Sequence, residues 1–189
     1  MFRVFLLALS LLLPALGVAA ETATNNPRLV IRTSEGDITV QLFADKAPAT
    51  VANFLNYVDS GFYNGTVFHR VIPNFMIQGG GFTPDLKEKE TADPVANESK
   101  NRLHNTRGTL AMARTSDPDS ATSQFFINQR NNLRLDWAPG QEGYTVFGEV
   151  IQGMDIVDFI TTAPTGRSGG MSDVPQQPIV IKEIVRQQP

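Results

Sequence analysis

The stretch Phe68–Phe82, which reads FHRVIPNFMIQGGGF, constrains the fold more than any other part of the chain. Two short apolar runs, Phe68–Ile72 and Phe75–Gln78, lie on either side of the turn-forming pair Pro73-Asn74. This pattern predicts two β-strands joined by a tight turn. The three glycines that follow, Gly79–Gly81, lack the Lys-Ser/Thr of a phosphate-binding loop. They instead predict close packing of the backbone against its neighbours.

An arginine lies inside the first of these runs. Side chains alternate between the two faces of a strand, so Phe68, Arg70 and Ile72 are expected to share one face. A charged side chain among apolar neighbours is costly to bury without a partner. The residues alone leave two interpretations open. One is a structural arginine that reaches solvent or an ion pair, and the other is an arginine held at the rim of an apolar pocket for a function.

The rest of the chain consists mainly of short apolar segments separated by turn-rich loops. Val51, Phe54, Leu55 and Val58 have helical spacing after Pro48, which predicts a helix. Further elements are expected as strands at Arg28–Thr33, Asp37–Phe43, Gly108–Ala113, Gln124–Asn128, Tyr144–Val150 and Ile179–Val185, a second helix at Gly153–Thr162, and loops at Thr83–Arg107 and Thr165–Pro178. Many short strands with only two helices indicate a barrel or a sandwich, and spacing alone does not choose between them.

The composition excludes several classes of protein. The chain has 16 basic and 19 acidic residues, a net charge of −3 and no basic stripe, so no nucleic-acid partner is expected. It has no cysteine and only two histidines, which excludes disulfides, thiolate nucleophiles and Cys- or His-rich zinc sites. No cofactor or metal is predicted. A length of 189 residues, 41% of them hydrophobic, suits one globular domain with a substantial core.

The first twenty residues, Met1–Ala20, have the pattern of a secretory signal peptide. Arg3 precedes the apolar run Val4–Leu13, and small residues before Glu21 predict cleavage after Ala20. The apolar run is shorter than the roughly 20 residues that span a bilayer, so no membrane anchor is expected after cleavage. The expected organisation is a signal peptide at residues 1–20, a flexible lead-in at residues 21–27 and one domain at residues 28–187 of an exported protein.

Three segments, in order, resemble the cyclophilin family of peptidyl-prolyl cis-trans isomerases: Phe68–Phe82, Gly108–Asn128 and Tyr144–Val150. The resemblance runs from about Arg28 to Arg186 and is strongest to compact, exported bacterial members. It implies a mainly β fold, namely a closed eight-stranded antiparallel barrel capped by two α-helices, with a packed interior and an external substrate groove. It also implies a monomeric, periplasmic isomerase that assists the folding of proline-containing polypeptide clients. Spacing of residues does not distinguish the periplasm from full secretion.

Isomerisation of a peptide bond requires neither a nucleophile nor a cofactor. Rotation must break amide resonance, a barrier of about 18–20 kcal/mol, and bonds before proline populate both isomers. The twisted state has lost the charge separation of the amide and carries a lone pair on the proline nitrogen. A catalyst lowers the barrier if it binds this state in an apolar pocket with a donor aimed at the nitrogen.

The resemblance implies roles for individual residues of this chain. Arg70 matches the family's catalytic arginine, whose fixed charge and forked donors can reach the proline nitrogen and the neighbouring carbonyl. The residues that match the holders of the proline ring are Phe75, Met76, Phe126 and Leu135. Taken singly, the two aromatic residues and Met76 are more typical of a plain barrel core, and it is the family pattern that favours a pocket.

Five further positions match contacts to the rest of the peptide. Gln78 and Gln124 match polar groups that orient Arg70 and the substrate backbone. Ala113 and Arg114 match the segment that pairs, through its backbone, with the residues before the proline. Tyr144 falls where many relatives carry a histidine, and its phenol retains a hydrogen-bond donor.

Arg134 departs from the family pattern. Relatives that bind cyclosporin tightly have a tryptophan at this position, so the chain lacks a large apolar surface and an indole donor there. The resemblance implies a cyclosporin site, and we expect Arg134 to weaken binding at that site. The departure leaves Arg70 and the proline pocket in place, so isomerase activity is still expected.

Two other functions compete with the isomerase. A non-catalytic, proline-peptide-binding chaperone module would need the pocket but not Arg70. A carrier of small ligands would need an open barrel interior, whereas the many large apolar residues of the chain predict a filled one.

Overall fold

The computed structural model of the protein describes residues 26–187. The predicted signal peptide and most of the predicted lead-in, Glu21–Pro27, lie outside the described residues. No helix within residues 26–187 has the length and hydropathy needed to cross a membrane.

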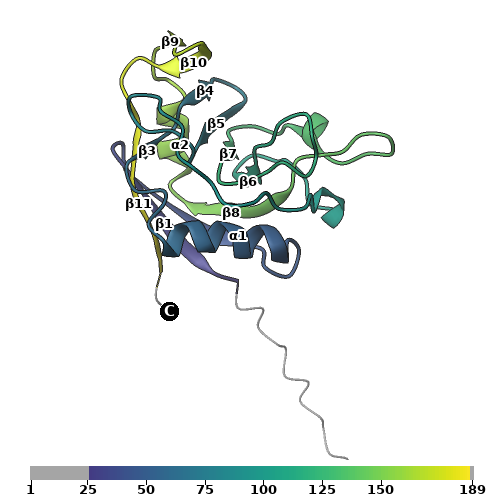
Figure 1. The fold of residues 1–189 in the computed structure, drawn as a ribbon. Helices are drawn as coiled ribbons and strands as arrows, with labels where there is room; N and C mark the ends of the chain where they lie inside the picture. Colours follow the sequence, from purple (N-terminus) through teal and green to yellow (C-terminus); the bar gives the residue numbers. More distant parts are fainter. Residues whose placement is uncertain (1–25, 188–189) are drawn as a thin grey trace, which may run out of the picture.

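One antiparallel sheet of nine strands forms most of the molecule (Figure 1). Its strands, in chain order, are β1 (Arg28–Thr33), β2 (Asp37–Leu42), β3 (Thr66–Val67), β4 (Arg70–Ile72), β5 (Met76–Gly79), β6 (Thr109–Met112), β7 (Phe125–Asn128), β8 (Val146–Gln152) and β11 (Val180–Arg186). In the sheet they follow the order β3-β11-β1-β2-β8-β6-β7-β5-β4. The prediction of a mainly β, barrel-like fold with two helices is confirmed.

The predicted closed, eight-stranded barrel needs a correction in detail. The two edges of the sheet, β3 and β4, are separated in the chain only by Phe68 and His69. The sheet therefore curls until its two edge strands are joined directly by these two residues of the chain. No hydrogen-bonded ladder connects β3 with β4. The predicted single strand Phe68–Ile72 is interrupted here, which is why the sheet has nine strands.

The same interruption overturns the predicted face of Phe68. Phe68 is fully buried in the main core together with Val71, while Arg70 and Ile72 are only half-buried on the other side. Alternation holds within β4 but does not extend back through Phe68 and His69, because these two residues lie outside the strands. Phe68 therefore does not share a face with Arg70.

The three glycines after Met76–Gln78 are explained by close contacts. A Cβ on Gly79 would lie 2.8 Å from the carbonyl oxygen of Val67, and one on Gly81 would lie 2.5 Å from Cγ of Gln124. Gly80 has a φ of +85°, which disfavours residues with side chains. The prediction of tight backbone packing at Gly79–Gly81 is confirmed.

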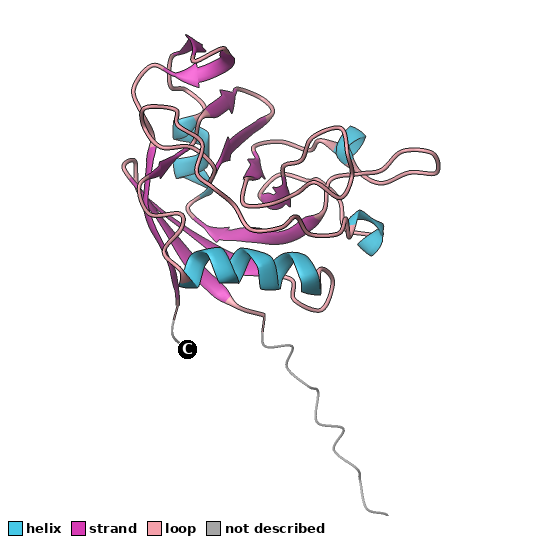
Figure 2. Cartoon of the chain, in the orientation of Figure 1, coloured by secondary structure: helices cyan, strands magenta, loops and turns pink. Residues whose placement is uncertain are grey.

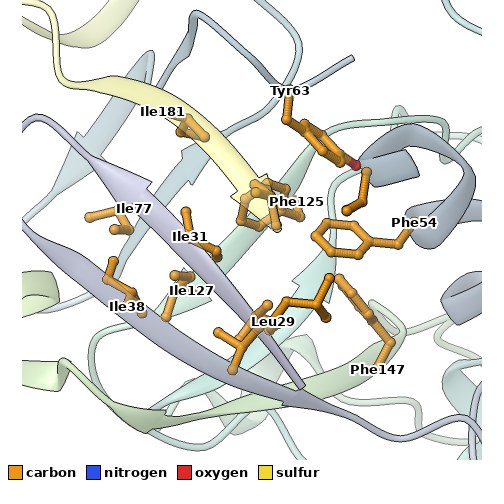
Figure 3. Packing of buried hydrophobic residues seen from close by; sticks show 14 of the residues in the cluster. Leu29, Ile31, Ile38, Phe54, Tyr63, Ile77, Phe125, Ile127, Phe147 and Ile181 are labelled. Atoms are coloured by element: carbon orange, nitrogen blue, oxygen red, sulfur yellow. The ribbon is translucent and has the colours of Figure 1, made fainter. Parts of the chain in front are cut away.

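Two helices, α1 (Pro48–Asp59) and α2 (Met154–Ile160), lie apart from one another along the curled sheet (Figure 2), and both contribute buried residues to the main core. Proline begins α1, where its missing N–H is not needed. Phe54 of α1 enters the core and lies 5.1–5.4 Å, between ring centroids, from the rings of Tyr63, Phe125 and Phe147. Figure 3 shows these rings packed with aliphatic side chains from the sheet. The barrel interior is thus filled, as predicted.

The segment Thr165–Pro178 is not the loop that its glycines and prolines predicted. It forms a separate two-stranded hairpin of β9 (Thr165–Ser168) and β10 (Met171–Pro175), which lies beside β4 (Figure 1). Met171 pairs with Ser168, so Gly169 and Gly170 form a two-residue turn with φ of +55° and +79°. A Gly-Gly pair is a hairpin signal in its own right. The mostly exposed β9 lacks the apolar alternation of a half-buried strand, which explains why the hairpin was missed.

Candidate active site

The predicted site residues lie together around one cavity of about 120 Å³. It is lined by Arg70, Phe75, Met76, Gln78, Ala113, Arg114, Phe126, Leu135 and Tyr144. The remaining predicted residue, Gln124, lines a neighbouring pocket of about 240 Å³ that shares Gln78, Ala113 and Arg114 with the first. The structure therefore brings the whole predicted set to one face of the molecule.

The strand register places the central side chains in one row. Arg70 of β4 lies opposite Gln78 of β5, Gln78 lies opposite Phe126 of β7, and Phe126 lies opposite Ala111 of β6. The residues next to these in each strand point to the opposite face, and their apolar side chains belong to the main core, as that of Ile77 does. The row therefore faces away from the barrel interior, and the cavity lies on the outside of the sheet.

Apolar side chains form one part of the cavity lining, beside the polar Arg70, Gln78 and Arg114. Met76 and Phe126 are 2% and 4% exposed, and they form a small cluster separate from the main core. The ring of Tyr144 meets Phe126 edge-on at 5.8 Å between centroids. The backbone N–H of Tyr144 donates to the carbonyl of Leu135 at 2.9 Å, which ties the two walls together.

Two arginines lie against these aromatic rings. The guanidinium of Arg114 lies 4.4 Å from the centre of the Tyr144 ring, and that of Arg134 lies 5.0 Å from the centre of the Phe75 ring. Such contacts favour one orientation of each ring and place positive charge at the cavity rim. Arg134, the residue that departs from the family pattern, therefore presents a charged group over the Phe75 ring.

Arg70 lies at the rim of the cavity with its side chain 42% exposed. Its Nε lies 3.8 Å from Oδ2 of Asp173, which belongs to β10 of the hairpin. This arginine has an ion-pair partner and also borders the cavity, so its position agrees with both interpretations, and a function for Arg70 stays a prediction. Sequence reasoning missed Asp173, since it falls in a segment predicted to be a loop.

A short hydrogen-bonded chain of side chains approaches Arg70 from the other side. Nε2 of Gln78 donates to Oε1 of Gln124 at 3.0 Å, and Nε2 of Gln124 donates to Oε1 of Glu88 at 3.5 Å. A carboxylate only accepts, so Glu88 favours this direction for both amides. The acceptor oxygen of Gln78 is then left for groups in the cavity. Glu88 was not predicted, because only the fold brings the charged run Asp85–Glu90 back to Gln124.

His69 lies beside Arg70 in the chain but does not line this cavity. The His69 side chain is 4% exposed, and its ring centroid lies 4.6 Å from that of Phe82. Burial lowers the pKa of His69 from 6.5 to about 4, and the charge of Arg70 acts in the same direction. His69 is therefore neutral at physiological pH and supports the structure.

A curled antiparallel sheet with a filled interior and an external apolar pocket, edged by an arginine, defines a peptide-binding protein of the cyclophilin class. The model of the family described as "Cyclophilin type peptidyl-prolyl cis-trans isomerase/CLD" matches residues 28–186. The chain belongs to this family, and it is an isomerase of peptide bonds that precede proline.

Bacterial relatives are similar over most of their length. The chain is 55% identical over 162 residues to a peptidyl-prolyl cis-trans isomerase of Acinetobacter baylyi, covering 86% of each chain. It is 54% identical over 160 residues to peptidyl-prolyl cis-trans isomerase B of Escherichia coli K12, covering 82% of this chain and 97% of that one.

Solved structures show the same fold. The crystal structure of a cyclophilin-type isomerase of Cryptosporidium parvum superimposes with a TM-score of 0.75 at 30% identity, covering 87% of this chain and 99% of that one. The same isomerase in the presence of the dipeptide Ala-Pro gives a TM-score of 0.74 at 31% identity, with 86% and 99% coverage.

Proposed function

We propose that this isomerase accelerates X–Pro rotation in the cavity bordered by Arg70, and that it assists the folding of exported proteins. The observation that carries the proposal is the row of Arg70, Gln78 and Phe126 across three neighbouring strands. This row places a fixed positive charge directly beside an apolar pocket of about 120 Å³. The Ala-Pro dipeptide present with the Cryptosporidium relative supports a proline-containing peptide as the occupant.

In the proposed mechanism the apolar walls hold the proline ring while the preceding residue rotates. Met76, Phe126 and Leu135 bury the ring and exclude water, which favours the less polar, twisted amide. The N–H groups of Arg70 donate to the lone pair that appears on the proline nitrogen as resonance is lost. This interaction is made only in the twisted state, so it lowers the barrier without tightening ground-state binding.

The residues before the proline lie along Ala113 and Arg114, beside Gln78. These positions follow directly after β6, at the boundary between the two pockets. An extended backbone placed there runs past both pockets, and the proline enters the apolar one. Rotation about the amide makes and breaks no covalent bond, so this mechanism requires no nucleophile, cofactor or metal.

Export follows from the leader Met1–Ala20, with a monomeric domain acting in the periplasm after cleavage at Glu21. Expression of the complete chain in a Gram-negative host, followed by fractionation and N-terminal sequencing, tests this part. Periplasmic protein that begins at Glu21 supports export. Cytoplasmic protein that retains Met1 contradicts it, and leaves the isomerase activity unaffected.

The decisive experiment measures the cis-to-trans rate of a short X–Pro peptide with the purified protein. A strong acceleration supports catalysis in this cavity, provided that a proline-free peptide does not compete. Tight binding of the peptide without acceleration favours the chaperone module instead. The small-ligand carrier is disfavoured because aromatic and aliphatic side chains fill the barrel interior.

A further inference from the structure

The β9–β10 hairpin places a carboxylate beside the arginine on which the proposed mechanism depends. Oδ2 of Asp173 lies 3.8 Å from Nε of Arg70, and the two side chains are 41% and 42% exposed. The hairpin is a separate two-stranded sheet that contacts β4, the strand of Arg70. The hairpin and β4 therefore lie in contact although no hydrogen-bonded ladder joins them. Asp173 and Arg70 form an ion pair across this contact.

The backbone of β10 is irregular at this residue. Met171 pairs with Ser168 and Val174 pairs with Gly166, so β10 has one more residue between these pairs than β9. Asp173 lies within this bulge and has a φ of +62°, in the left-handed region. A bulge re-aims the side chains of its strand, and aspartate is among the few residues other than glycine that tolerate this conformation.

The ion pair engages one particular edge of the guanidinium. Oδ2 of Asp173 approaches Nε, so the two terminal nitrogens of Arg70 are not needed for this ion pair. Within residues 26–187 the guanidinium has no second ion-pair partner. A half-exposed arginine has several rotamers of similar energy, and fixing its charge costs conformational entropy.

We propose that Asp173 is a positioning residue, which holds the guanidinium of Arg70 by its Nε edge so that the terminal N–H groups face the proline pocket. This inference rests on the proposed catalytic role of Arg70. Asp173 does not touch the substrate. Its effect is to raise the fraction of molecules in which Arg70 is already oriented when the amide twists.

The test uses substitutions that suit the left-handed backbone. Asp173→Gly removes the carboxylate and Asp173→Asn removes only its charge, and both residues tolerate a positive φ better than alanine does. The neighbouring Ser172→Ala, at an exposed position of the same strand, is the matched control. For Asp173→Gly we expect kcat to fall by about three- to five-fold with KM nearly unchanged, since an exposed ion pair is weak. The kcat of Asp173→Asn should lie between that of Asp173→Gly and that of the wild type, and the kcat of the control should match the wild type.

Two further readouts separate positioning from a general structural effect. In the Arg70→Ala background, Asp173→Gly should cause no additional loss, because the partner is gone. In about 1 M salt, the difference between wild type and Asp173→Gly should shrink as the ion pair is screened. An undiminished kcat in Asp173→Gly, or an equal loss in both backgrounds, overturns the inference while the proposed function stands. Full activity of Arg70→Ala overturns the proposed catalytic role and the inference with it.

Discussion

Arg70 lies directly opposite Gln78 in the ladder between β4 and β5. Their side chains therefore leave the sheet on the same face, at the same level, and both border the external cavity. Gln78 is itself held by Gln124, so the arginine faces an oriented amide on one side and Asp173 on the other.

Replacing Arg70 with alanine should lower kcat/KM by about 10- to 100-fold, because a charged hydrogen bond contributes roughly 1.5–3 kcal/mol. The assay is the isomerisation rate of an X–Pro peptide. Arg130→Ala, which removes an exposed arginine outside the cavity, serves as the control and should keep full activity. Equal activity of all three proteins would exclude Arg70 as the catalytic residue.

The rate should be flat between about pH 6 and 8, since the proposed mechanism has no proton transfer. Arginine remains charged throughout this range, and His69, with its pKa lowered to about 4, remains neutral. The measurement is kcat/KM across the range at constant ionic strength. A bell-shaped profile would instead require a general acid and a general base.

Stability should decrease as the pH falls from 7 to 5 because of His69. The folded pKa is about 4, against 6.5 for the free side chain, so the unfolded state binds a proton that the folded state does not. The free energy of unfolding is therefore highest above about pH 6.5 and decreases as the pH falls toward the folded pKa. The loss amounts to about 2 kcal/mol by pH 5. Denaturant unfolding at the two pH values measures this loss.

Variants of the two histidines provide the controls for this effect. His69→Asn should flatten the dependence, while His104→Gln, which changes a side chain that is 68% exposed, should retain it. If the wild type is equally stable at pH 7 and at pH 5, then His69 is not held neutral by burial.

Replacing Phe54 with alanine should lower the free energy of unfolding by about 3–5 kcal/mol, the usual cost of emptying an aromatic site in a core. Phe54 is fully buried and meets three aromatic rings inside the curled sheet. Phe159→Ala in α2 is the matched control, since that ring is 58% exposed. Denaturant unfolding should show little change for the control, and similar losses in the two variants would contradict the packing described.

Replacing Arg134 with tryptophan should tighten cyclosporin binding by at least about tenfold, because an indole supplies apolar area and a donor. The present guanidinium lies over the Phe75 ring, where it presents charge to the rim of the pocket. Calorimetric titration measures the affinity, and isomerase activity toward a short peptide should stay close to that of the wild type. Unchanged affinity would show that Arg134 does not limit cyclosporin binding.

The local parts of the fold were predictable from periodicity. Arg28–Thr33 forms a strand with the predicted bounds, and Pro48 begins a helix whose apolar positions enter the core. The hairpin of β9 and β10 was missed because its first strand is mostly exposed and carries no apolar alternation. Phe68 was assigned to the wrong face because alternation cannot reveal where a strand is interrupted.

The site was predictable as far as the resemblance to a known family extended. Residues of the segments that carry the resemblance, such as Gln78 in Phe68–Phe82 and Phe126 in Gly108–Asn128, come together as expected. Asp173 and Glu88 were not anticipated, because each reaches the site from a polar segment outside those signatures. Their contacts depend on how the β9–β10 hairpin and the loop of Glu88 fold over the sheet, and these polar segments have no periodicity from which to infer their placement.

The closure of the sheet through Phe68 and His69 also bears on aggregation. A protein that handles unfolded chains meets segments with unpaired strands, and exposed edges invite such segments to add to a sheet. The two edge strands, β3 and β4, are two and three residues long and follow one another in the chain. These two edge strands offer another chain little backbone to pair with, so they limit the addition of a further strand at β3 or β4.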